Sequence, residues 1–89
     1  MKLQLILAGP YETCLNTRKI WTNACDKHGL KLEVTDLESE AGQKLEAELN
    51  IKSFPALLVN NQVKAVGHPD SSAATELINN LIQQQHSQQ

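Results

Sequence analysis

The sequence predicts one α/β domain in which three helices flank a four-stranded mixed sheet, in the order βαβαββα. Three observations predict this class: an almost wholly apolar run at residues 3–8, helical periodicity over residues 13–29, and a proline at the entrance of the apolar run 55–59. The chain has 89 residues, which is enough for one domain. A domain of this size buries only about 60–65% of the surface that its unfolded chain exposes, so every element must share one compact core.

The first half of the chain supplies two strands and two helices. Leu3–Ala8 resembles a strand that is covered on both faces, and Gly9-Pro10 ends it. A helix is predicted from about Thr13 to Gly29, followed by an alternating strand at residues 30–35 and a helix at about residues 39–50. The inner face of the first helix is predicted to hold residues that recur three and four apart: Cys14, Thr17, Ile20, Trp21, Ala24, Cys25 and His28.

The second half supplies a hairpin and a last helix. Pro55–Val59 is predicted as the third strand, and Asn60-Asn61 as a tight turn that tolerates positive φ before Gln62–Val66 returns antiparallel. Asp70 or Ser71 is expected to cap a helix whose apolar stripe ends at Ile82. We therefore expect a folded domain at residues 1–82 and a disordered, glutamine-rich tail at residues 83–89.

Charge and hydropathy argue against two classes of partner. The net charge is -2 and the Lys and Arg residues are scattered, so no basic patch for nucleic acid is indicated. The apolar run that follows Lys2 is shorter than the ~7–15 residues of a signal peptide, and no segment approaches the ~20 apolar residues of a membrane span. We expect a cytoplasmic monomer that binds neither nucleic acid nor membrane.

The two cysteines, Cys14 and Cys25, fall in the same predicted helix. At ~1.5 Å rise per residue their Cα atoms would lie about 16 Å apart, beyond the roughly 7 Å limit for a disulfide. Cys25 and His28 are suitably spaced to share a metal ion, but the sequence offers no convincing second pair of ligands. We therefore expect free thiols, a packing role for Cys25, and neither a metal nor a cofactor.

Three features resemble the thioredoxin superfamily over residues 1–82: Cys14 at the start of the first helix, Phe54-Pro55 before the third strand, and Val66-Gly67 before the last helix. The chain is most similar to the small thioredoxin-like and glutaredoxin-like proteins. The resemblance implies a Cys-x-x-Cys motif where the first strand meets the first helix. It also implies that Pro55 matches the cis-proline of the family, and an X-Pro bond in such a place is a candidate for the cis form.

The Cys-x-x-Cys motif is incomplete in either of two alignments. If Cys14 matches the second motif cysteine, the motif becomes Tyr11-Glu12-Thr13-Cys14; the length of the helix from Cys14 to Gly29 favours this register. If Pro10-Tyr11 is set against the Cys-Pro-Tyr-Cys of glutaredoxins, Gly9 and Glu12 replace both cysteines. In both alignments the dithiol pair is absent.

Cys14 is the candidate catalytic residue. The start of a helix stabilises a thiolate, whereas an enclosed position and the neighbouring Glu12 disfavour it, so a reactive thiol and a packing role both stay open. The residues expected to bind a substrate or partner are Tyr11, Phe54, Pro55, Gly67 and His68. A cis bond before Pro55 would expose the backbone of Phe54 for pairing with an extended peptide.

Three functions follow from these residues. The first is a thiol-disulfide oxidoreductase relative with a degenerate, single-cysteine site and weak or absent dithiol activity. The second is a non-catalytic protein- or peptide-binding module that uses the groove beside Pro55. The third is a carrier that holds sulfur or glutathione on Cys14. Whether the protein is an enzyme stays open, and its partner is a protein or peptide, or else glutathione or another small thiol.

Overall fold

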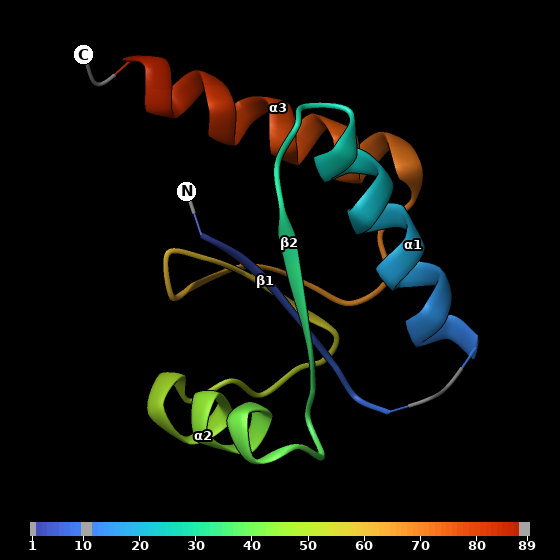
Figure 1. Cartoon of the computed structure of the whole chain (residues 1–89), viewed down its shortest axis with the longest axis vertical. Helices are drawn as coiled ribbons and strands as arrows, with labels where there is room; N and C mark the ends of the chain where they lie inside the picture. Colours follow the sequence, from blue (N-terminus) through green and yellow to red (C-terminus); the bar gives the residue numbers. More distant parts are fainter. Residues whose placement is uncertain (1, 10–11, 88–89) are drawn as a thin grey trace.

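The computed structural model describes residues 2–9 and 12–87 (Figure 1). Its elements follow the predicted order: β1 (Leu3–Leu7), α1 (Glu12–Asp26), β2 (Leu32–Asp36), α2 (Glu40–Leu49), β3 (Ala56–Val59), β4 (Gln62–Val66) and α3 (Ser71–Ser87). None of the helices described is long and apolar enough to cross a membrane.

The four strands form one mixed sheet in the order β2-β1-β3-β4. β1 lies parallel to β2, as a strand-helix-strand connection requires, and antiparallel to β3, which forms a hairpin with β4. Leu5 lies in the middle of β1, where it pairs with Val34 of β2 on one side and with Leu57 of β3 on the other. The predicted α/β class with its four-stranded mixed sheet is therefore confirmed.

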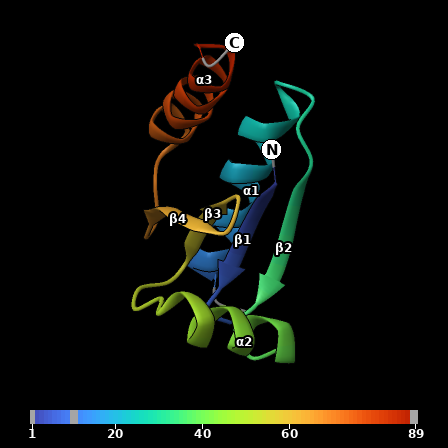
Figure 2. The ribbon, with the colours of Figure 1, turned by 90° about the vertical axis from the view of Figure 1, so that its left-hand side faces the viewer.

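The helices cover the two faces of the sheet unequally. Figures 1 and 2 show α2 apart from α1 and α3, which pack against each other. The larger core cluster joins α1 and α3 to one face of the sheet: Leu3, Leu5, Leu7, Cys14, Trp21, Ala24, Cys25, Leu57, Val59, Ala74, Ile78 and Leu81. The smaller cluster lies on the other face, with Leu45 and Leu49 of α2 packed against it: Ile6, Ile51, Ala56 and Leu58.

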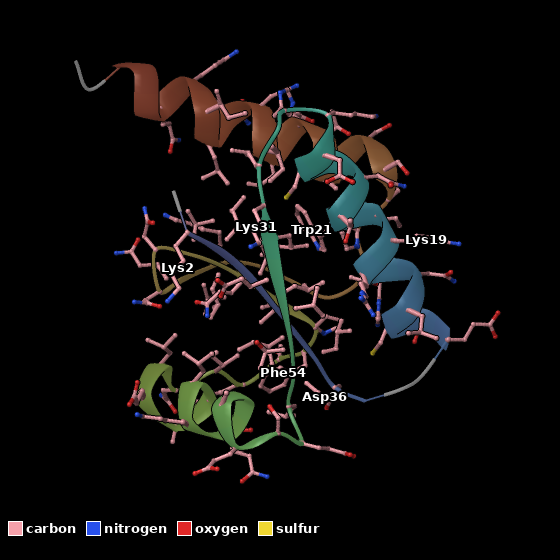
Figure 3. The ribbon with its side chains drawn as sticks, in the orientation of Figure 1. Lys2, Lys19, Trp21, Lys31, Asp36 and Phe54 are labelled. Atoms are coloured by element: carbon pink, nitrogen blue, oxygen red, sulfur yellow. The ribbon has the colours of Figure 1, made fainter. Side chains whose placement is uncertain are left out.

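Helix α1 buries most of its predicted inner face. Trp21 is only 2% exposed and lies between the helix and the sheet, as Figure 3 shows. The prediction for His28 is wrong, because α1 ends at Asp26 and His28 lies exposed in the turn that follows. Gly29 in this turn has φ +67°, a conformation that glycine adopts without steric cost. The helix therefore ends three residues before Gly29, where the sequence predicts its end.

Helix α2 packs its first turn closely against the segment that precedes it. The Ser39 hydroxyl accepts a hydrogen bond from the Gly42 N–H at 3.1 Å and so caps the helix. A Cβ atom built on Gly42 would collide with the Asp36 carbonyl oxygen and lie 2.9 Å from the Leu37 Cα atom. Only a residue without a side chain lets α2 approach the end of β2 this closely.

The hairpin between β3 and β4 turns at Asn60-Asn61, as predicted, and both residues have positive φ, 51° and 65°. The turn is tied to the start of β1. The Lys2 N–H donates to Asn60 Oδ1 at 2.9 Å, and the Asn60 N–H donates to the Lys2 carbonyl at 2.9 Å. The first strand is therefore held at its amino end as well as along its length.

Helix α3 begins at Ser71, and the Asp70 carboxylate accepts a hydrogen bond from the Ala73 N–H at 2.7 Å, which confirms the predicted cap. The helix continues to Ser87, beyond the end expected near Ile82. Residues 83–87 of the expected disordered tail are thus helical. Glutamine is a good helix former, and neither glycine nor proline interrupts this segment. Residues 88 and 89 lie outside the described residues.

Candidate functional site

The predicted site residues gather at one end of the sheet. Ile6 near the end of β1 pairs with Ala56 at the start of β3, and Ala56 in turn pairs with Val66 at the end of β4. The start of α1, the Phe54-Pro55 segment and the Gly67-His68 segment therefore meet at this end. Tyr11, also predicted here, lies outside the described residues.

The Phe54–Pro55 peptide bond is cis. Pro55 is buried, and its carbonyl accepts a hydrogen bond from the Gly67 N–H at 2.8 Å, which joins the entrance of β3 to the exit of β4. The Phe54 side chain is half-buried and packs against the cluster on the α2 face (Figure 3). Within the described part of the chain, no backbone hydrogen bond uses the N–H or the C=O of Phe54.

Cys14 lies in the first turn of α1, as predicted, but its side chain points into the protein. It is 3% exposed and belongs to the larger core cluster together with Leu7 and Trp21. A thiol in such surroundings packs as a small apolar group and is poorly accessible to a disulfide in solution.

Cys25 lies three turns further along α1 and is fully buried. Burial raises the pKa of its thiol from 9.0 to about 11, with a smaller contribution from the negative charge of Asp26. The thiol is therefore protonated at neutral pH, in agreement with the packing role predicted for it. Both cysteines are free thiols.

His68 is connected to α1 through a residue that the sequence did not assign to the site. Its Nδ1 atom lies 2.6 Å from Thr17 Oγ1, and the same hydroxyl lies 3.0 Å from the Thr13 carbonyl oxygen. The Thr17 side chain is 1% exposed, whereas His68 is exposed. The sequence placed Thr17 on the buried face of α1, but a contact between residues 51 positions apart leaves no local signal.

Titratable side chains do not converge on a metal site in the described part of the chain. No three His, Cys, Asp or Glu residues of that part lie close enough together to hold an ion. Cys25 and His28 also do not form a pair of ligands, since one is buried in the core and the other is exposed beyond the helix end. Among the described residues of the predicted site, the titratable side chains are those of Cys14 and His68.

A family model described as a thioredoxin domain matches residues 1–79. The chain belongs to the thioredoxin family. Comparison with curated proteins found no match. The resemblance inferred from Cys14, Pro55 and Gly67 is therefore confirmed at the level of family and fold.

This thioredoxin domain brings together three of the predicted partner-binding residues. Pro55 and Gly67 are hydrogen-bonded, and His68 follows directly and contacts α1 one turn beyond Cys14. Phe54 adds a backbone N–H and C=O that make no hydrogen bond to another described residue. The backbone of this arrangement can pair with an extended chain. However, both cysteines are buried, so no exposed thiol can attack a disulfide in solution.

Proposed function

We propose that this thioredoxin-family domain binds extended protein or peptide segments beside Pro55 and has no dithiol redox turnover. One observation carries the proposal: both cysteines of the chain are enclosed in the core, Cys14 at 3% and Cys25 at 0% exposure. Disulfide reduction needs an attacking thiolate and a second thiol that resolves the mixed disulfide. A degenerate motif with one buried cysteine meets neither need.

The binding half of a thioredoxin-like site remains available. An extended chain can pair with backbone groups that have no partner of their own, and the N–H and C=O of Phe54 are such groups among the described residues. The hydrogen bond between Gly67 and Pro55 fixes the neighbouring backbone, which reduces the entropy lost on binding.

A second candidate function is single-thiol chemistry at Cys14, with glutathione or another small thiol as the partner. Its support is the position of Cys14 in the first turn of the 15-residue helix α1, where the resemblance to the family places a motif cysteine. This function requires that the thiol becomes accessible in the folded protein.

Alkylation kinetics separate the two functions. In a Cys25→Ala variant only Cys14 can react, and its labelling by iodoacetamide is compared in the native state and in urea. We expect labelling at least about 100-fold slower in the native state, since the thiol reacts only when the protein opens locally. Native labelling as fast as in urea would show that Cys14 is accessible in the folded protein, as single-thiol chemistry requires, and would contradict the absence of a reactive thiol on which the first function rests.

Binding is tested with carboxymethylated insulin B chain, an extended polypeptide without free thiols, by NMR titration of the ¹⁵N-labelled protein. We expect amide shifts at Phe54, Gly67 and His68, unchanged in a Cys14→Ser variant that retains the fold. Absence of shifts at these amides, or shifts confined to β2, would contradict the proposal. A parallel insulin-reduction assay with dithiothreitol should show no acceleration by this protein.

A further inference from the structure

The hydroxyl of Thr17 makes two short contacts with polar atoms, and only one of them can use its proton. Thr17 Oγ1 lies 3.0 Å from the Thr13 carbonyl oxygen and 2.6 Å from His68 Nδ1. A threonine hydroxyl has one proton to donate and two lone pairs that accept. The carbonyl oxygen can only accept, whereas the histidine nitrogen donates in one tautomer and accepts in the other.

The carbonyl of Thr13 decides how the protons are arranged. If the Thr17 hydroxyl donated to His68, its lone pairs would face the Thr13 oxygen at 3.0 Å with no proton between the two oxygens. If it donates to Thr13, as threonines in helices commonly do four residues back, it accepts from His68 and both contacts become hydrogen bonds. The second arrangement satisfies a hydroxyl that is 1% exposed.

We propose that Thr17 is a positioning residue that holds the neutral form of His68 as its Nδ1–H tautomer, with Nε2 presented as a hydrogen-bond acceptor for a bound polypeptide. The inference rests on the proposed function for the ligand, but not for the tautomer. His68 is exposed, and its Nε2 makes no hydrogen bond to the described residues. The hydrogen bond between the Gly67 N–H and the Pro55 carbonyl joins the residue before His68 to the proposed backbone-pairing segment.

The ligand chemistry follows from the tautomer. An unprotonated Nε2 accepts from a backbone N–H, a hydroxyl or an ammonium group, and it offers nothing to a carboxylate. The site should therefore favour peptides with a hydrogen-bond donor at this position over peptides with Asp or Glu there. Without Thr17 the ring would be free to rotate and to change tautomer, and this selectivity would be lost.

The tautomer is measured in the free protein by ¹⁵N NMR of the histidine rings. Substitutions at His28 and His86 assign the signals, and exposed His28 serves as the reference for an unrestrained ring. We expect Nδ1 of His68 in the range of a protonated nitrogen and Nε2 in the range of an unprotonated one. Thr17→Ser should keep this pattern, and Thr17→Val should abolish it. A ring that carries its proton on Nε2 and not on Nδ1 would overturn the proposal.

Binding of carboxymethylated insulin B chain tests the consequence for recognition. Thr17→Val should weaken binding about fivefold to tenfold, as for the loss of one hydrogen bond, whereas Thr17→Ser should stay within about twofold. His68→Phe should match Thr17→Val, and the two changes together should cost no more than either one alone. Independent, additive losses would contradict a role for Thr17 that acts through His68. If the B chain does not bind even the unmodified protein, the proposed function fails while the tautomer result still stands.

Discussion

The two faces of the sheet are built in different ways. On the α1 and α3 face, large side chains such as Trp21 and Ile78 fill a thick layer between the helices and the strands. On the α2 face the buried cluster is small, and the helix instead brings its own backbone at Gly42 against the carbonyl of Asp36. Packing on the α1 and α3 face thus depends on the volume of the buried side chains. Packing on the α2 face depends on the lack of a side chain at Gly42.

The residues of the proposed site belong to both faces of the sheet. Cys14 and Thr17 are part of the thick layer, so the atoms next to the site are fixed by the packing of α1. Phe54 packs toward the α2 face. The proposed groove therefore lies where both kinds of packing meet, and a change on either face can reach it by a different route.

The largest effect should come from emptying the thick layer. Trp21→Ala removes a side chain that is 2% exposed, and should lower the free energy of unfolding by about 3–5 kcal/mol because the cavity cannot be refilled. Leu15→Ala on the same helix is the matched control, since Leu15 is 50% exposed and should cost less than about 0.5 kcal/mol. Urea denaturation followed by circular dichroism measures both. Equal losses would show that this face does not depend on volume.

A smaller loss of stability is expected from adding one methyl group on the α2 face. Gly42→Ala improves helix propensity, which alone would stabilise the protein by about 1 kcal/mol. Its Cβ would nevertheless lie 2.9 Å from the carbonyl carbon of Asp36, and we expect a net loss of about 3 kcal/mol from this overlap. Ala47→Gly, at an exposed position of α2, should cost about 1 kcal/mol. A Gly42→Ala variant more stable than the parent protein would refute the close approach.

The smallest effect concerns the titration of Cys25, which is buried in the core between α1, α3 and the sheet. The pKa of Cys25 rises from 9.0 to about 11 on folding, so the folded protein keeps this proton at a pH where the unfolded chain has lost it. The stabilisation is complete below about pH 9 and falls by about 2 kcal/mol as the pH rises toward 11. Urea denaturation at pH 8, 9 and 10 should show this slope, and a Cys25→Ala variant should lack it. Parallel curves for the two proteins would mean that the thiol is not desolvated.

The sequence was a good guide wherever the signal was local. Apolar alternation, the Asn60-Asn61 turn and the cap at Asp70 each depend on a few neighbouring residues, and the structure has all of them. The errors lie at helix ends. His28 was placed on the inner face because the spacing fits, but the spacing does not show that the helix has already ended at Asp26.

The site was only partly predictable for a physical reason. Pro55 and Gly67 are marked by the resemblance to the family, His68 directly follows Gly67 in the sequence, and the structure brings all three to one end of the sheet. The partnership of Thr17 with His68 and the close approach at Gly42 arise from tertiary contacts. Threonine and glycine inside a helix are common enough that neither residue signals such a role on its own.

The paired hydrogen bonds between Lys2 and Asn60 have a practical consequence. They lie at the hairpin end of the sheet, whereas the proposed groove lies where β3 begins, at the opposite end of the same strands. A biotin or fluorophore attached at the exposed Asn61 of the hairpin turn would leave the molecule at the end of the sheet remote from Pro55. Biosensor capture through that turn would then display the recognition surface outward, toward the flowing analyte.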